Sequence, residues 1–259
     1  MLIYVINLDG STDRWNNISS QLNHLGLQYQ RIAAVNGRAI TLDGIVHFEK
    51  CQRQMGRDIQ PGEVGCFLSH LKALKAFLET NDDFAVILED DARLHDTFKD
   101  GLKAIRSELQ KLGANLSSLV NLAPSDYKYS SVYRSLEGCT LHRTHRFPMM
   151  AMGVIWSRTA AQKVLDSALP ITMPFDNFLR HTFTGGNAGF STKPALMTQQ
   201  GVPSDIAVGR SRSRANRSKW YFFIKIRRAW TEKVRATLSL VAWRLQVVAR
   251  ATTAWRSHT

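Results

Sequence analysis

The first 35 residues carry the pattern that most constrains the fold: an apolar run, a helical stretch and a second apolar run. Residues 2–6 are apolar and largely β-branched, which is typical of a buried strand. Apolar side chains then recur at steps of three and four from Trp15 to Leu25, the spacing of one helix face. Gly26 predicts the helix end, and residues 29–35 are predicted to form a second strand. This order predicts a parallel sheet covered by helices.

The same alternation continues along the body of the chain. Residues 38–61 interrupt it, because they are rich in charge and show no clear period. The further elements that we expect are helices over about 63–80, 97–112 and 158–169, and strands over 84–88 and 116–122. Residues 148–156 are apolar, with Gly153 among them. The chain is therefore predicted to hold one α/β domain with a mainly parallel sheet over residues 1–206.

The net charge of +13 is concentrated in the last fifth of the chain. Thirteen of the 34 lysines and arginines, but only one of the 21 acidic residues, lie after residue 205. The body is therefore nearly neutral. This distribution predicts a basic linker over residues 207–219 and a basic tail over residues 220–259.

The cysteines and the hydropathy pattern bear on the compartment. Cys51, Cys66 and Cys139 form no C-x-x-C pair, which argues against a disulfide framework or a structural zinc site and fits a reducing compartment. We find neither a secretory leader nor 18 consecutive uncharged apolar residues. We therefore expect the protein to remain in the cytoplasm.

Three consecutive carboxylates, Glu89, Asp90 and Asp91, follow the most apolar predicted strand. Open α/β sheets bind ligands beyond the carboxyl ends of their strands, and a hard divalent cation offsets the repulsion between neighbouring carboxylates. In an extended chain Glu89 and Asp91 point to one side, so both can bind one Mg²⁺ or Mn²⁺ ion, while Asp90 faces elsewhere. Such an ion would neutralise a diphosphate. The alternative is a solvated acidic turn.

Several segments together carry a family resemblance. Four of them match in order, at residues 6–14, 33–37, 61–70 and 86–91, and weaker matches follow at residues 153–161, 173–176 and 199–206. The sequences INLDGSTDR, AAVNG, PGEVGCFLSH and VILEDD resemble glycosyltransferase family 25, the lipooligosaccharide galactosyltransferase-like group. Asn36, where aspartate is more usual, and the turn at Gly10 and Ser11 depart from the family pattern and leave the donor open.

The resemblance implies a GT-A-like nucleotide-sugar transferase domain and a sugar transfer with inversion at the anomeric carbon. It also implies UDP-galactose as the donor and a lipid-linked lipooligosaccharide or lipopolysaccharide-type acceptor. The tail after residue 207 lies outside the resemblance.

Residues near the end of the first strand are expected to bind the donor. Arg14 opens the first helix, where its guanidinium can pair with diphosphate oxygens. Asn7 and Asp9 can hydrogen-bond the nucleoside, and Asp90 is assigned to the same site. The alternative is that Arg14 is solvated and that Asn7 and Asp9 only form the turn.

The 61–70 motif contributes Glu63, Ser69 and His70 to the predicted donor site. His70 can bind phosphate or can be a satisfied core histidine, and its type does not distinguish the two. Cys66 lies one helical turn before His70, but no third group is in view to orient the pair, which argues against a thiol nucleophile.

An inverting transfer needs a general base that deprotonates the acceptor hydroxyl. We assign this role to Asp176, because Pro174 places it at the start of a short predicted helix over residues 176–183. The alternative is an acidic residue that merely suits a helix N-terminus.

The tail combines basic residues with one continuous apolar helix face. Four of the six tryptophans lie in it. Such a helix is typical of an anionic membrane surface, which would place the protein on the inner face of the cytoplasmic membrane. Packing on the body or in an oligomer, and RNA binding by the basic linker, are the alternatives; the apolar, tryptophan-rich surface favours the membrane. The face consists of Ile226, Trp230, Val234, Leu238, Val241, Leu245 and Val248.

Two other functions are alternatives to glycosyl transfer. A catalytically silent protein on the same fold, tethered to membrane or RNA, would not need the intact acidic triplet. A metal-dependent phosphoryl transferase would share the triplet, but residues 9–12 are a poor match to a phosphate-binding glycine loop or an aspartyl nucleophile.

Overall fold

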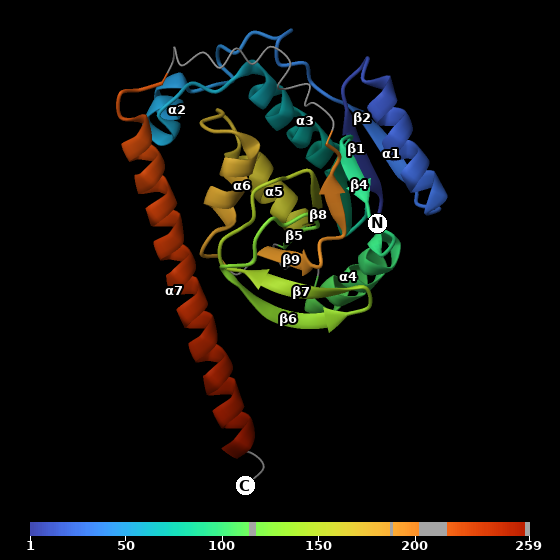
Figure 1. Ribbon diagram of the computed structural model, residues 1–259, viewed down its shortest axis with the longest axis vertical. Coiled ribbons are helices and arrows are strands. Elements are labelled where there is room, and N and C mark those ends of the chain that lie inside the picture. Colours follow the sequence, from blue (N-terminus) through green and yellow to red (C-terminus); the bar gives the residue numbers. More distant parts are fainter. Residues whose placement is uncertain (114–117, 187–188, 202–216, 257–259) are drawn as a thin grey trace.

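The computed structural model describes residues 1–113, 118–186, 189–201 and 217–256, with side chains up to residue 249. Most of the predicted linker, residues 207–216, lies outside the described residues. In the described part, a layered α/β body is accompanied by one long helix, α7 (Tyr221–Arg256), which runs along its side (Figure 1).

A mixed eight-stranded sheet forms the middle of the body. Its strands are β1 (Ile3–Asn7), β2 (Tyr29–Ala33), β3 (Phe84–Glu89), β5 (Leu119–Asn121), β6 (Ser130–Leu136), β7 (Cys139–Thr144), β8 (Gly153–Ser157) and β9 (Gly189–Lys193). Their order is β2-β1-β3-β8-β5-β9-β7-β6. Only β8 and β7 are antiparallel to both of their neighbours, so six of these eight strands run in one direction. The prediction of an α/β fold with a mainly parallel sheet is confirmed.

Helices cover both faces of this sheet (Figure 1). One face packs against α1 (Thr12–His24) and α4 (Phe98–Leu112), and the other against α3 (Pro61–Leu78), α5 (Arg158–Ser167) and α6 (Phe175–Phe183). Alternate residues of β1 therefore enter different cores: Ile3 and Val5 enter one, and Tyr4 and Ile6 enter the other. Burial on both faces explains why β1 is apolar at nearly every position.

The structure differs from the sequence predictions where the chain carries little periodicity. Within the segment expected to be irregular, α2 (Phe48–Met55) forms and ends at Gly56, whose φ of 69° is left-handed. The β6–β7 hairpin and β9 are also additional. So is a small antiparallel sheet of β4 (Ala92–Leu94) and β10 (Met197–Gln199), since three-residue strands are too short to show a period of two.

No helix in the described part of the chain is both long enough and apolar enough to cross a bilayer.

Candidate functional site

A cavity of about 420 Å³ lies at the carboxyl ends of β1, β2 and β3. Because these strands are parallel, the segments that follow them converge at one edge of the sheet. The first turn of α1 and the first half of α3 complete its wall. Seven of the ten predicted site residues line it, namely Asp9, Arg14, Ser69, His70, Glu89, Asp90 and Asp91.

Two glycines allow α3 to approach the loop that follows β2. A Cβ atom on Gly65 would lie 2.5 Å from the Val35 carbonyl oxygen, and one on Gly37 would collide with the Pro61 carbonyl. Ser69 secures the same contact. Its hydroxyl donates to the Gly65 carbonyl at 2.6 Å and accepts the Val35 N–H at 2.8 Å. The Ser69 hydroxyl is thus already engaged in holding the cavity wall together.

Asp90 is buried in the turn after β3 and orients two residues of the first βα unit. Its Oδ2 accepts from Asn7 Nδ2 at 2.7 Å, and its Oδ1 accepts from Arg14 Nη1 at 3.3 Å. Burial raises the pKa of Asp90, while the bond from Asn7 and the charge of Arg14 oppose that rise. Asn7 lies behind the cavity lining, and Asp90 couples it to Arg14, which lines the cavity.

Asp91 faces the strand β10, which is far away in the sequence. Its Oδ2 accepts from Gln199 Nε2 at 2.8 Å, whereas its Oδ1 is buried and has no partner among the described residues. Burial raises the pKa of Asp91; the Gln199 bond opposes this rise and the charge of Asp90 adds to it. A buried carboxylate oxygen without a partner is costly, so this atom is suited to a ligand.

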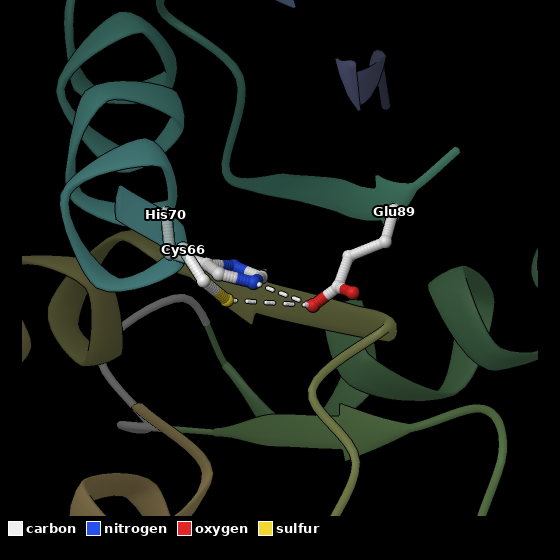
Figure 2. Close-up of side chains that lie close together, drawn as sticks. All are labelled: Cys66, His70 and Glu89. Atoms are coloured by element: carbon white, nitrogen blue, oxygen red, sulfur yellow. Dashed lines mark hydrogen bonds and ion pairs between the residues drawn. The ribbon is translucent and has the colours of Figure 1, made fainter. Parts of the chain in front are cut away.

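Glu89 points toward α3, where it meets Cys66 and His70 (Figure 2). Its Oε1 lies 3.0 Å from His70 Nε2 and 3.9 Å from Cys66 Sγ. His70 is buried and stacks on Phe175 with ring centroids 4.2 Å apart, while its Nδ1 has no partner among the described residues. One ligand atom from each of Cys66, His70 and Glu89 lies within 4.8 Å of the others.

The environment of Cys66 is unsuited to a nucleophilic thiolate. Burial raises the pKa of the Cys66 thiol well above its usual range, and the charge of Glu89 adds to that effect. A thiolate, not a thiol, is the nucleophile. This agrees with the argument against a thiol mechanism.

The carboxylates of Glu89 and Asp91 fit a hard divalent cation. Both oxygens of Asp90 already accept hydrogen bonds, whereas Asp91 Oδ1 has no partner in the described part of the chain and the Glu89 side chain is 28% exposed. Mg²⁺ and Mn²⁺ prefer such oxygen ligands. Asp91 Oδ1 is thus open to a ligand, and the expectation that Glu89 and Asp91 share one ion stays a prediction.

Arg31 organises the turn after β1, although no sequence motif marks it. Its Nε donates to Asn7 Oδ1 at 2.8 Å, and its Nη2 donates to Asp9 Oδ1 at 2.5 Å. Arg31 reaches them from β2 because β1 and β2 are parallel neighbours. Asp9 therefore lies at the cavity wall with one oxygen already paired.

Glu63 lies outside the cavity lining, at the start of α3. Its carboxylate binds the Arg57 guanidinium with distances of 2.6 and 2.8 Å and accepts the Gln60 N–H at 2.9 Å, closing a capping box. A role in donor binding stays a prediction. These contacts give Glu63 a structural role, because they stabilise the N-terminus of α3.

Asp176 also lies outside the cavity lining, in the first turn of α6. Its Oδ1 accepts the Ala151 N–H at 2.8 Å. Burial raises the pKa of Asp176, and the charge of Glu89 raises it further, while His70 opposes the rise. The structure therefore brings Asp176 within electrostatic reach of Glu89 and His70.

Comparisons with known proteins agree with one another on the family. The family described as "Glycosyltransferase family 25 (LPS biosynthesis protein)" matches residues 1–179. Procollagen galactosyltransferase 1-B of Xenopus laevis is 24% identical over 203 residues, which cover 74% of this chain and 33% of that protein. A glycosyltransferase 25 family member of Aedes aegypti is 28% identical over 124 residues, covering 43% of this chain and 19% of the relative. The chain thus spans a third or less of the length of these relatives.

One solved structure resembles part of this chain. The crystal structure of a glycosyltransferase involved in the glycosylation of the major capsid of PBCV-1 has a TM-score of 0.40 and 11% sequence identity, and the match covers 78% of this chain and 93% of that chain. The sequence match to the family spans more than half of the chain and includes every residue that lines the cavity. The chain belongs to glycosyltransferase family 25.

Proposed function

We propose that this chain transfers a sugar from a nucleotide diphosphate donor to a hydroxyl group, with inversion at the anomeric carbon. The observation that carries the proposal is the cavity where Arg14 and the carboxylates of Glu89 and Asp91 converge at the ends of parallel strands. Membership of family 25 supports glycosyl transfer as the reaction class. Residues 9–12 still lack the features of a phosphoryl-transfer loop.

The donor diphosphate would lie against the first turn of α1. Helix N-termini present unpaired N–H groups to anions, and Arg14 adds a guanidinium that Asp90 already orients. Mg²⁺ or Mn²⁺, held by Glu89 and Asp91, would supply positive charge that stabilises the departing nucleoside diphosphate. His70 holds Glu89 in position through its Nε2.

Asp176 is our candidate for the general base. A base acts best when its pKa is close to the working pH, and burial together with Glu89 raises the pKa of Asp176 in that direction. The Ala151 N–H fixes one of its oxygens.

We further infer that the donor is UDP-galactose and that the acceptor is a lipid-linked oligosaccharide of the lipopolysaccharide type. The first inference draws on relatives described as procollagen galactosyltransferases, and the second on the description of the family. Since a lipid-linked acceptor lies at a membrane, we place the enzyme on the inner face of the cytoplasmic membrane, with residues 220–259 as the attachment.

Donor hydrolysis tests this proposal. UDP-galactose, UDP-glucose, UDP-N-acetylglucosamine and GDP-mannose would each be incubated with the full chain in Mn²⁺, in Mg²⁺ and in EDTA. We expect release of UDP from UDP-galactose that depends on the metal. Nucleotide binding without turnover of any donor would instead identify a silent binding protein.

A further inference from the structure

The long helix α7 contacts the body through a narrow and mainly polar inner face. Glu232 is buried there, and its Oε2 accepts from Arg146 Nη2 at 2.9 Å while its Oε1 lies 3.9 Å from Arg228 Nε. Two turns further on, Ser239 Oγ lies 3.0 Å from His145 Nδ1. A buried charge with specific partners sets the rotation of the helix about its axis, because any other rotation would leave Glu232 unpaired.

Two arginines extend this inner contact along the helix. Arg235 of α7 donates to the carbonyl oxygens of Thr184 at 2.7 Å and His181 at 3.2 Å, at the end of α6. Near the other end of the contact, the Arg143 guanidinium of β7 lies 4.3 Å from the ring centroid of Trp243. The helix is thus held at several points between residues 228 and 243.

The opposite, outer face of α7 exposes the apolar residues that the sequence groups on one helix face. Ile226, Trp230, Leu238 and Leu245 are each 64–68% exposed. The helix therefore does pack on the body, as one of the alternatives to membrane binding expected, but through its inner face and not through this apolar face. We define the outer face of α7 as seven residues that are all exposed: Ile226, Trp230, Val234, Leu238, Val241, Leu245 and Val248.

Positive charge surrounds the outer face. Arg227, Lys233 and Arg244 are exposed, and helical spacing places them on the same half of α7 as the outer face. Between residues 220 and 249 the sequence has one acidic residue, Glu232, which faces inward and is paired. The exposed surface thus combines apolar side chains with uncompensated basic ones.

We propose that the outer face of α7 lies flat on an anionic lipid bilayer while the inner face stays bound to the body. Apolar side chains enter the interfacial region of a bilayer, and basic side chains beside them contact anionic headgroups. This inference rests on the proposed function for its lipid-linked acceptor. It deepens that function by naming the residues that bind lipid and those that keep the catalytic body attached to the bound helix.

The composition of the outer face favours lipid over other occupants. A second copy of this helix in a two-fold contact would bring the basic residues of one copy against those of the other. The apolar spacing of four, four, four, three, four and three also lacks the alternation of a heptad seam. Nucleic acid is disfavoured because most outer-face residues are aliphatic and cannot stack on bases.

Cosedimentation of the full chain with vesicles tests the proposal. Vesicles of phosphatidylglycerol and phosphatidylcholine would be compared with phosphatidylcholine alone. We expect the double variant Leu238→Gln/Leu245→Gln to bind the anionic vesicles at least tenfold more weakly. The matched control is Val132→Gln on β6, where the replaced side chain is 64% exposed, and it should bind like the unaltered protein.

Further variants separate the roles of the two faces. Lys233→Gln/Arg244→Gln should lose the preference for anionic over neutral vesicles. Ser239→Ala removes an inner-face hydroxyl and should keep full vesicle binding. Equal binding by the outer-face variant and the unaltered protein would overturn the proposal. So would equal losses from the inner-face and outer-face variants, or a dimer that the outer-face variant dissociates in the absence of lipid.

Donor hydrolysis without vesicles, measured on the same proteins, separates this inference from the proposed function. The outer-face variants should hydrolyse UDP-galactose at the unaltered rate, since the outer face does not line the cavity. If lipid binding requires Leu238 but no donor is turned over, only the proposed transferase activity is refuted. Turnover without lipid binding would refute only the role of α7.

Discussion

At the scale of single residues, the three consecutive carboxylates at the end of β3 have different contacts. Both carboxylate oxygens of Asp90 accept hydrogen bonds, one from Asn7 and one from Arg14, and these bonds orient the first βα unit. Asp91 keeps one buried oxygen without a partner among the described residues, and Glu89 meets His70. The repulsion between neighbouring carboxylates is thus relieved partly by protein donors. We propose that a divalent cation offsets the remaining repulsion.

The proposed role of Asp91 as a metal ligand predicts a specific defect. Asp91→Asn keeps the size of the side chain but removes its negative charge, so we expect the Mn²⁺ concentration for half-maximal activity to rise at least tenfold. Mn²⁺ binding measured by calorimetry should weaken in parallel. In Asp90→Asn, by contrast, the KM for the donor should rise more than the metal requirement, because Asp90 acts through Arg14. Indistinguishable metal titrations of Asp91→Asn and the unaltered protein would refute the assignment.

The proposed role of Asp176 as general base predicts that its substitution lowers activity without lowering stability. In Asp176→Asn the amide oxygen can still accept the Ala151 N–H, while the charge that burial and Glu89 disfavour is lost. We expect transfer to slow by about a hundredfold or more, with unchanged UDP affinity and an equal or higher Tm. Asp166→Asn on α5 is a matched surface control. Normal turnover by Asp176→Asn would exclude it as the base.

At the scale of elements, the cavity depends on how closely α3 approaches the loop after β2. The contact joins Gly37 and Gly65, which leave no room for a Cβ atom, and Ser69 bonds across it. The cavity wall is therefore built from backbone in close contact. Small displacements of α3 would move Cys66 and His70 relative to Glu89.

Gly65→Ala tests this contact, because alanine in a helix interior ordinarily stabilises it relative to glycine. Here the added Cβ would lie 2.5 Å from the Val35 carbonyl, so we expect a loss of about 1–3 kcal/mol in the free energy of unfolding. The KM for the donor should also rise. Gly186→Ala, where a Cβ would meet nothing within 4 Å, is the control in urea unfolding. A gain in stability from Gly65→Ala would contradict the close contact.

At the scale of the whole molecule, His145 joins the β6–β7 hairpin to α7. Its Nε2 lies 3.0 Å from Ser131 Oγ and its Nδ1 3.0 Å from Ser239 Oγ. Burial lowers the pKa of His145 to about 4, and the charges of Arg143 and Arg244 contribute. The neutral imidazole is thus the form that connects the two elements.

The lowered pKa of His145 predicts that acid weakens the fold. Below its unfolded pKa of about 6.5 the unfolded chain binds a proton that the folded chain does not, so stability falls as the pH drops. Between pH 8 and pH 5 this loss amounts to about 2 kcal/mol. Buried carboxyls with raised pKa values act in the opposite direction, so urea unfolding of His145→Gln is compared with the unaltered protein at both pH values. Equal pH dependence in both would contradict this prediction.

Much of the body follows from local pattern. The apolar run of β1, the helix face of α1 and the strand that leads into Glu89 can be predicted because burial repeats with the period of each element. The cavity at the strand ends follows from the parallel order, and seven predicted residues line it. The periods of these strands and helices depend on neighbours in the chain, and the parallel order brings their ends together.

Contacts between distant segments could not be predicted in this way. Gln199 reaches Asp91 across 108 residues, and Arg146 pairs with Glu232 across 86. No local period records such partners, because they depend on how loops return separate elements to one place. Periodicity identifies the apolar face of α7 but does not predict whether that face points toward the body or toward solvent. The buried Glu232 ion pair turns that face outward, since an unpaired charge against the body would cost more than exposed apolar side chains.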